Sequence, residues 1–117
     1  MKTKGRLLTE MERSALLKPK RQTVSEWSDN HRILSALTSA EPGKWRTSRT
    51  PYLRDVMDAF SDSLVEEITL LTAAQVGKTE ACLNMLAYAV DQDPGPTLWV
   101  MPKIQEARSI SQNRIIP

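Results

Sequence analysis

Three consecutive residues, Gly77, Lys78 and Thr79, have the types and spacing to bind a nucleoside triphosphate. A glycine allows backbone N–H groups to close around a phosphate, a lysine ammonium reaches the β- and γ-phosphates, and a threonine hydroxyl ligates Mg²⁺. The triplet therefore predicts a site for ATP and Mg²⁺, with Thr79 as the metal ligand. The phosphate loop of this site is predicted to consist of Thr72, Ala73, Ala74, Gln75, Val76, Gly77, Lys78 and Thr79.

The triplet alone is a weak signal, because the usual motif also has a glycine six positions before the lysine, where this chain has Thr72. The alternative interpretation is an unrelated α/β domain in which a helix begins with Lys78. A lysine in the first turn of a helix opposes the helix dipole unless an anion compensates it. The positive charge of Lys78 at a helix start therefore favours a site for an anionic nucleotide over the unrelated domain.

The loop must be positioned by a strand before it and a helix after it. Residues 68–72 are a short apolar run typical of a buried strand, and residues 78–91 have helical periodicity. Residues 97–101 match a second buried strand, and residues 103–116 match another amphipathic helix. This order predicts an α/β fold, namely the start of a parallel sheet with flanking helices, as in part of a P-loop NTPase.

A short helical region is expected before this unit. Residues 23–26 (Thr-Val-Ser-Glu) match a capping box, which predicts a helix through residues 27–37 with Trp27, Leu34 and Leu37 facing inward. A second helix is predicted to begin at Thr50, as a hydroxyl cap, followed by a proline at the first helical position. Its apolar residues at helical spacing are Tyr52, Leu53, Val56, Met57 and Phe60.

Composition limits the class of protein. The chain has 117 residues, 40% of them hydrophobic, which suits one small domain or a piece of a larger one. Its one cysteine, Cys82, and one histidine, His31, exclude an internal disulfide framework and a Cys/His zinc cluster. No apolar run approaches the roughly 20 residues of a membrane span. We therefore expect a cytosolic protein without a membrane segment.

The positive charge is concentrated at the amino terminus. Residues 1–21 carry a net charge of +5, whereas the whole chain carries +2. We expect residues 1–22 to form a basic, flexible tail and residues 23–117 to form the domain. The tail could contact nucleic acid or an acidic partner; the alternative is a solvated terminus without a partner.

Five ordered blocks together resemble the amino-terminal part of the large terminase subunit of tailed bacteriophages, in the lambda-like group. The resemblance spans roughly residues 24–117, and terminases of this kind tolerate threonine at the position of Thr72. The blocks are residues 25–27, 39–47, 49–54, 74–80 and 93–96.

This resemblance implies a fragment of a DNA-packaging motor, in which an ATPase translocates double-stranded DNA and a nuclease domain cuts it. It implies ATP and Mg²⁺ as cofactors, and viral DNA, the small terminase subunit and the portal or procapsid as partners. It also implies an oligomeric motor in the cytoplasm of a bacterial host. By position, Lys78 and Thr79 bind the phosphates and Mg²⁺, and Tyr52 stacks on the adenine. Ordinary core packing is the alternative for Tyr52.

The chain lacks other parts of that machinery. Residues 73–75 contain no arginine, and no acidic pair follows an apolar strand to hold Mg²⁺ and polarise water. In members of the family, this acidic pair and the carboxylates of the nuclease domain lie further along the chain than the position that corresponds to Pro117. We therefore expect a truncated ATPase domain that binds ATP without hydrolysing it, so no catalytic residue is identified. The alternatives are a non-catalytic prophage remnant that binds the small subunit through residues 1–22 and, less favoured, a helicase-like P-loop ATPase.

Overall fold

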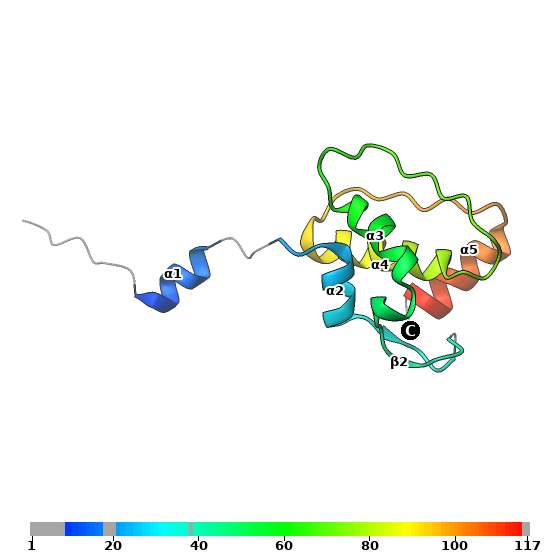
Figure 1. Cartoon of the computed structure of the whole chain (residues 1–117), viewed down its shortest axis with the longest axis horizontal. Coiled ribbons are helices and arrows are strands. Elements are labelled where there is room, and N and C mark those ends of the chain that lie inside the picture. Colours follow the sequence, from blue (N-terminus) through cyan, green and yellow to red (C-terminus); the bar gives the residue numbers. More distant parts are fainter. Residues whose placement is uncertain (1–8, 18–20, 38, 116–117) are drawn as a thin grey trace, which may run out of the picture.

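The computed structural model describes residues 9–17, 21–37 and 39–115. Figure 1 shows α2, α3, α4 and α5 gathered in one body, with α1 standing apart from it. The elements in chain order are α1 (Glu10–Leu16), α2 (Val24–His31), β1 (Ile33–Leu34), β2 (Gly43–Lys44), the 3-10 helices η1 (Thr47–Arg49) and η2 (Pro51–Leu53), α3 (Arg54–Phe60), α4 (Lys78–Gln92), α5 (Ile104–Ile110) and the π-helical turn η3 (Ser111–Ile115).

The hydrophobic core lies among α2, α3 and α4. On α4, the side chains of Ala81, Met85 and Tyr88 are spaced to share one face of the helix, and all three are buried. The core therefore holds α2, η2 and α3 against the helix that follows the predicted phosphate loop. Its buried members are Val24, Trp27, Trp45, Leu53, Met57, Ala81, Met85 and Tyr88.

The capping box at the start of α2 is confirmed. The hydroxyl of Thr23 accepts from the backbone N–H of Glu26 at 3.4 Å, and the Glu26 carboxylate accepts from the N–H of Thr23 at 3.2 Å. The predicted continuation of the helix to residue 37 is wrong. After His31 the chain turns into β1, which pairs antiparallel with β2, and Leu37 is 94% exposed. The backbone hydrogen bonds of this hairpin replace those of the longer helix.

The helix predicted at Thr50 and Pro51 begins there only as a 3-10 turn. Pro51 opens η2, and the regular helix α3 starts at Arg54. Thr50 does not act as a cap: its hydroxyl oxygen is buried and has no hydrogen-bond partner among the described residues. α4 and the start of α5 agree with the helices predicted at residues 78–91 and 103–116.

The two predicted strands are not strands in this structure. Residues 65–73 and 94–101 have no regular secondary structure, and in the described part of the chain the sheet consists of β1 and β2 alone. A strand needs a neighbour to satisfy its N–H and C=O groups, and neither segment has one. Accordingly, Leu71 is 97% and Leu98 is 86% exposed. The fold is a helical body with a small antiparallel sheet, and the parallel sheet is not confirmed.

The segment predicted as a flexible tail contains α1. Its capping box is complete, with the N–H of Thr9 donating to the Glu12 carboxylate at 2.8 Å, but the helix buries no residue. The rest of this prediction falls on residues 1–8 and 18–20, which lie outside the described residues. Among the described helices, none has the length and apolar character needed to cross a bilayer.

Candidate functional site

Gly77 shapes the end of the predicted phosphate loop. It is the N-cap of α4 and has φ +88° and ψ 16°, a left-handed conformation that glycine adopts at little cost. A Cβ atom at this position would lie 3.3 Å from Cδ1 of Leu53, whose side chain is 1% exposed. Both the backbone conformation and the close approach to the core favour glycine here.

The first turn of α4 presents backbone N–H groups without partners. No side chain caps the helix, and the N–H groups of residues 77–80 donate no hydrogen bond to any other described residue. α4 is 15 residues long, so these groups lie at the positive end of a substantial helix dipole. This combination is suited to binding an anion such as a phosphate.

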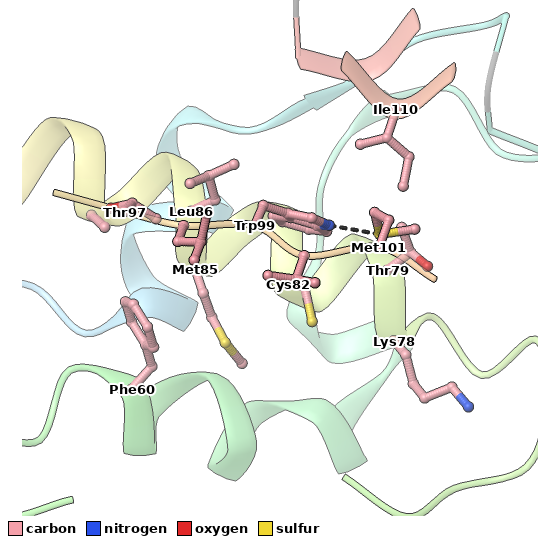
Figure 2. Close-up of a pocket in the computed structure, with 13 residues that line it drawn as sticks. Phe60, Lys78, Thr79, Cys82, Met85, Leu86, Thr97, Trp99, Met101 and Ile110 are labelled. Carbon is pink, nitrogen blue, oxygen red and sulfur yellow. Dashed lines mark hydrogen bonds between the residues drawn. The ribbon is translucent and has the colours of Figure 1, made fainter. Parts of the chain in front are cut away.

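The side chain of Lys78 folds back over the loop. Its Nζ donates to the backbone oxygen of Thr72 at 3.4 Å, a long hydrogen bond that an anion can replace. Figure 2 shows the Lys78 side chain pointing away from the apolar residues of the neighbouring cavity. Thr79 is an exposed residue, and Mg²⁺ commonly takes its remaining ligands from phosphates and water. The residues present therefore fit the predicted ligand.

A cavity of about 470 Å³ lies between α4 and residues 97–101, and we call it the apolar cavity (Figure 2). Burial raises the pKa of the Cys82 thiol, so this side chain is a poor nucleophile. Inside the cavity, the indole N–H of Trp99 donates to the sulfur of Met101 at 2.8 Å. The cavity is lined by Phe60, Lys78, Thr79, Cys82, Met85, Leu86, Ala89, Thr97, Leu98, Trp99, Val100, Met101 and Ile110.

A second cavity of about 600 Å³ lies beside the loop, and we call it the basic cavity. Its volume falls within the range of about 300–1,000 Å³ that is usual for ligand pockets. Residues 75–77 form part of its wall, and three basic and two acidic side chains also line it. The full lining is Leu34, Ser39, Ala40, Glu41, Pro42, Lys44, Trp45, Arg46, Arg49, Thr50, Tyr52, Gln75, Val76, Gly77 and Glu80.

Tyr52 lies in the wall of the basic cavity and is attached to the loop. Its hydroxyl donates to the backbone oxygen of Val76 at 3.0 Å. The side chain is 58% exposed, so Tyr52 is not a core residue, in contrast to the alternative considered from the sequence. An exposed ring anchored at its hydroxyl has a face free for stacking.

An acidic residue one turn into α4 joins three parts of the chain. Glu80 accepts from Arg32 at 2.9 Å and from Arg114 at 2.8 Å, and Arg32 also donates to Asn84 at 2.9 Å. These contacts tie the start of α4 to the end of α2 and to η3. The sequence did not identify this network: an acid in the first turn of a helix was visible, but its partners are 48 and 34 residues away.

The predicted site residues do not all face one cavity. Residues 75–77 and Tyr52 line the basic cavity, whereas Lys78 and Thr79 line one end of the apolar cavity. Residues 72–74 are exposed and line neither. The loop thus separates two cavities, with its free N–H groups at the junction. No cluster of His, Cys, Asp and Glu suited to a metal ion occurs within the described ranges.

Comparisons with known proteins give a consistent result. The sequence profile of the family described as phage terminase large subunit gpA, ATPase domain, matches residues 39–117. The terminase large subunit of Escherichia phage lambda is 26% identical over 103 residues, and that of Enterobacteria phage P21 is 25% identical over 103 residues. Each alignment covers 88% of this chain and only 16% of the relative. No solved structure matches the chain.

Proposed function

Because the chain belongs to the family of phage terminase large subunit gpA ATPase domains, we propose that it is the ATP-binding part of a viral DNA-packaging motor. The observation that carries this proposal is the set of unbonded N–H groups at residues 77–80, beside Lys78 and at the positive end of α4. Such an arrangement binds phosphate groups.

Each residue of the loop has a role in this proposal. Gly77 holds the turn in which the N–H groups point toward the phosphates, and Lys78 exchanges the carbonyl of Thr72 for a phosphate oxygen. Thr79 offers its hydroxyl to Mg²⁺, and Tyr52 offers its ring to the base. ATP supplies the free energy that the motor converts to movement. The chain's own residues bind and orient it.

The fold of the complete domain is also part of the proposal. The chain spans 16% of the length of its relatives, so we propose that residues 68–72 and 97–101 are strands of a P-loop sheet whose neighbours come from the rest of the protein. Their exposed apolar side chains, such as Leu71 and Leu98, support this. Residues 23–117 are then the first part of the ATPase domain, and residues 1–22 are its basic tail.

We propose the whole protein's activity and partners on the same basis. The whole protein translocates viral double-stranded DNA and cuts it with a nuclease domain. It works as an oligomer and binds the small terminase subunit and the portal or procapsid. Its place is the cytoplasm of a bacterial host. The adjacent acidic pair Glu66-Glu67 precedes the proposed strand at residues 68–72 and does not follow it, so we propose that the acidic residues for hydrolysis lie in the rest of the protein.

A second role is favoured by α1. Met11 and Leu16 of this helix, and Leu17 directly after it, are between 72% and 84% exposed, in a segment of net positive charge. Exposed apolar side chains within a segment of net positive charge suit a partner surface. The chain would then act as a binding module that contacts the small subunit. Deleting residues 1–22 should abolish that contact; unchanged binding would exclude this role.

Titration with a fluorescent ATP analogue and Mg²⁺ tests the main proposal. Lys78→Ala should weaken binding about tenfold or more, because it removes a charge-assisted contact to phosphate. Lys103→Ala is the matched control, since Lys103 is an exposed lysine at the start of another helix, α5. Absence of binding by the wild type, or equal binding by both variants, would refute the proposal.

A further inference from the structure

Three basic side chains, Lys44, Arg46 and Arg49, line the basic cavity together with residues 75–77 of the loop. They come from β2 and η1 and the residues between them, about 30 positions before the loop in the sequence. The uncharged loop residues 73–75 cannot supply a cation themselves. The fold therefore brings to the loop a group of positive charges in addition to that of Lys78.

The acidic side chains of the basic cavity do not neutralise all of these cations. Glu41 forms an ion pair with Arg49. Glu80 forms ion pairs with Arg32 and Arg114, neither of which lines this cavity. Within the described residues, Lys44 and Arg46 form no ion pair or side-chain hydrogen bond. The cavity thus has a net attraction for anions, located on the side formed by residues 44–46.

A buried hydroxyl without a partner lies in the same wall. The Oγ1 atom of Thr50 is buried and makes no hydrogen bond with any described residue, although the residue lines the basic cavity. Buried polar atoms are nearly always hydrogen-bonded, so an exception in a cavity wall points to a ligand that completes it. This observation is independent of the charges, and the residue belongs to the wall of the same cavity.

From these observations we infer that Arg46 binds the phosphate chain of the nucleotide whose phosphates are also held by the N–H groups of residues 77–80. The inference rests on the proposed function and adds a phosphate-binding residue outside the loop. A guanidinium can donate two parallel hydrogen bonds to a phosphate, which a lysine cannot do. Lys44 adds a point charge beside it.

Binding measurements on the full chain test this inference. Arg46→Ala should weaken the affinity for ATP with Mg²⁺ about tenfold and leave the affinity for adenosine unchanged, because only ATP carries phosphates. Arg46→Lys should recover part of the loss. The matched control is Arg108→Ala, since Arg108 is an exposed arginine on α5 that lines neither cavity, and this variant should bind ATP like the wild type.

The outcomes separate this inference from the proposed function. If Lys78→Ala weakens ATP binding and Arg46→Ala does not, the inference is wrong and the proposed function stands. If Arg46→Ala weakens ATP and adenosine equally, Arg46 does not act through the phosphates, which also overturns the inference. If the wild type binds no ATP, both fail. Thermal melts of all variants show whether a lost affinity comes from lost folding.

Discussion

Replacing Gly77 with alanine tests whether the folded chain requires the left-handed backbone conformation at this position. Alanine in the left-handed region costs about 1–2 kcal/mol relative to its preferred conformations. The new Cβ would also lie 3.3 Å from Cδ1 of Leu53, which is buried and has little room to move. For a chain of 117 residues, each kcal/mol lowers the melting temperature by about 4 °C. We therefore expect Gly77→Ala to melt about 4–8 °C below the wild type.

Circular dichroism on heating measures this difference directly. The control is Gly95→Ala, because Gly95 has no positive φ and a Cβ there would meet nothing within 4 Å. Its melting temperature should equal or slightly exceed that of the wild type, since alanine restricts the unfolded chain. If Gly77→Ala melted at the temperature of the wild type, the left-handed turn and the contact with Leu53 would not exist as described.

Three further predictions concern the body of the protein. Met57 is fully buried among α2, α3 and α4, so Met57→Ala should lose about 2–5 kcal/mol of stability in a denaturant titration; a loss below about 1 kcal/mol would contradict its place in the core. Hydrogen bonds from Gln92 and Trp27 hold the pKa of Asp91 below its ordinary value of 3.8. The ionised carboxylate therefore stabilises the folded state above about pH 3.8, and this stabilisation is lost as the pH falls through the lowered pKa. Stability measured at a series of acid pH values should fall more steeply for the wild type than for Asp91→Asn, and equal slopes would contradict this. Burial raises the pKa of Cys82, so iodoacetamide should alkylate it more slowly at pH 8 than in the unfolded chain; equal rates would show that the thiol is not shielded.

Local signals in the sequence predicted local structure well. The capping box at Thr23, the proline at the start of η2 and the helical span of α4 depend on residues close together in the chain, and the structure contains all three. The end of α2 was missed because the hairpin from β1 to β2 competes with the helix. That competition depends on Trp45, whose buried side chain holds the returning strand against the core.

The two strands were predicted from apolar runs. Such a run indicates that a segment can form a buried strand, but it does not indicate which segment it pairs with. Residues 68–72 and 97–101 have the right composition, yet pairing needs a partner strand that the described residues do not supply. The apolar pattern of residues 78–91 favours a face with Cys82, Leu86 and Val90, but the core members on α4 are different residues. The face with Ala81, Met85 and Tyr88 packs into the core, whereas Cys82, Leu86 and Ala89 line the apolar cavity beside it.

The candidate site was partly accessible from the sequence. The glycine at the helix start and the lysine after it followed from the motif, and the left-handed conformation of Gly77 agrees with that use. The approach of Arg46 and Thr50 to the loop could not be predicted, because it depends on how α3 packs against α4. The exposure of Tyr52 was likewise hidden by its place in a helical apolar pattern.

The most direct test of the central claim is to follow the backbone amide signals of residues 77–80 by NMR while ATP and Mg²⁺ are added. The chain has a mass of 13.2 kDa, which suits this measurement. The signals of these four amides should move with a common saturation curve, while those of α1 stay in place. If the amides of residues 77–80 kept their positions at saturating nucleotide, or if only signals elsewhere moved, the loop would not bind the phosphates of ATP.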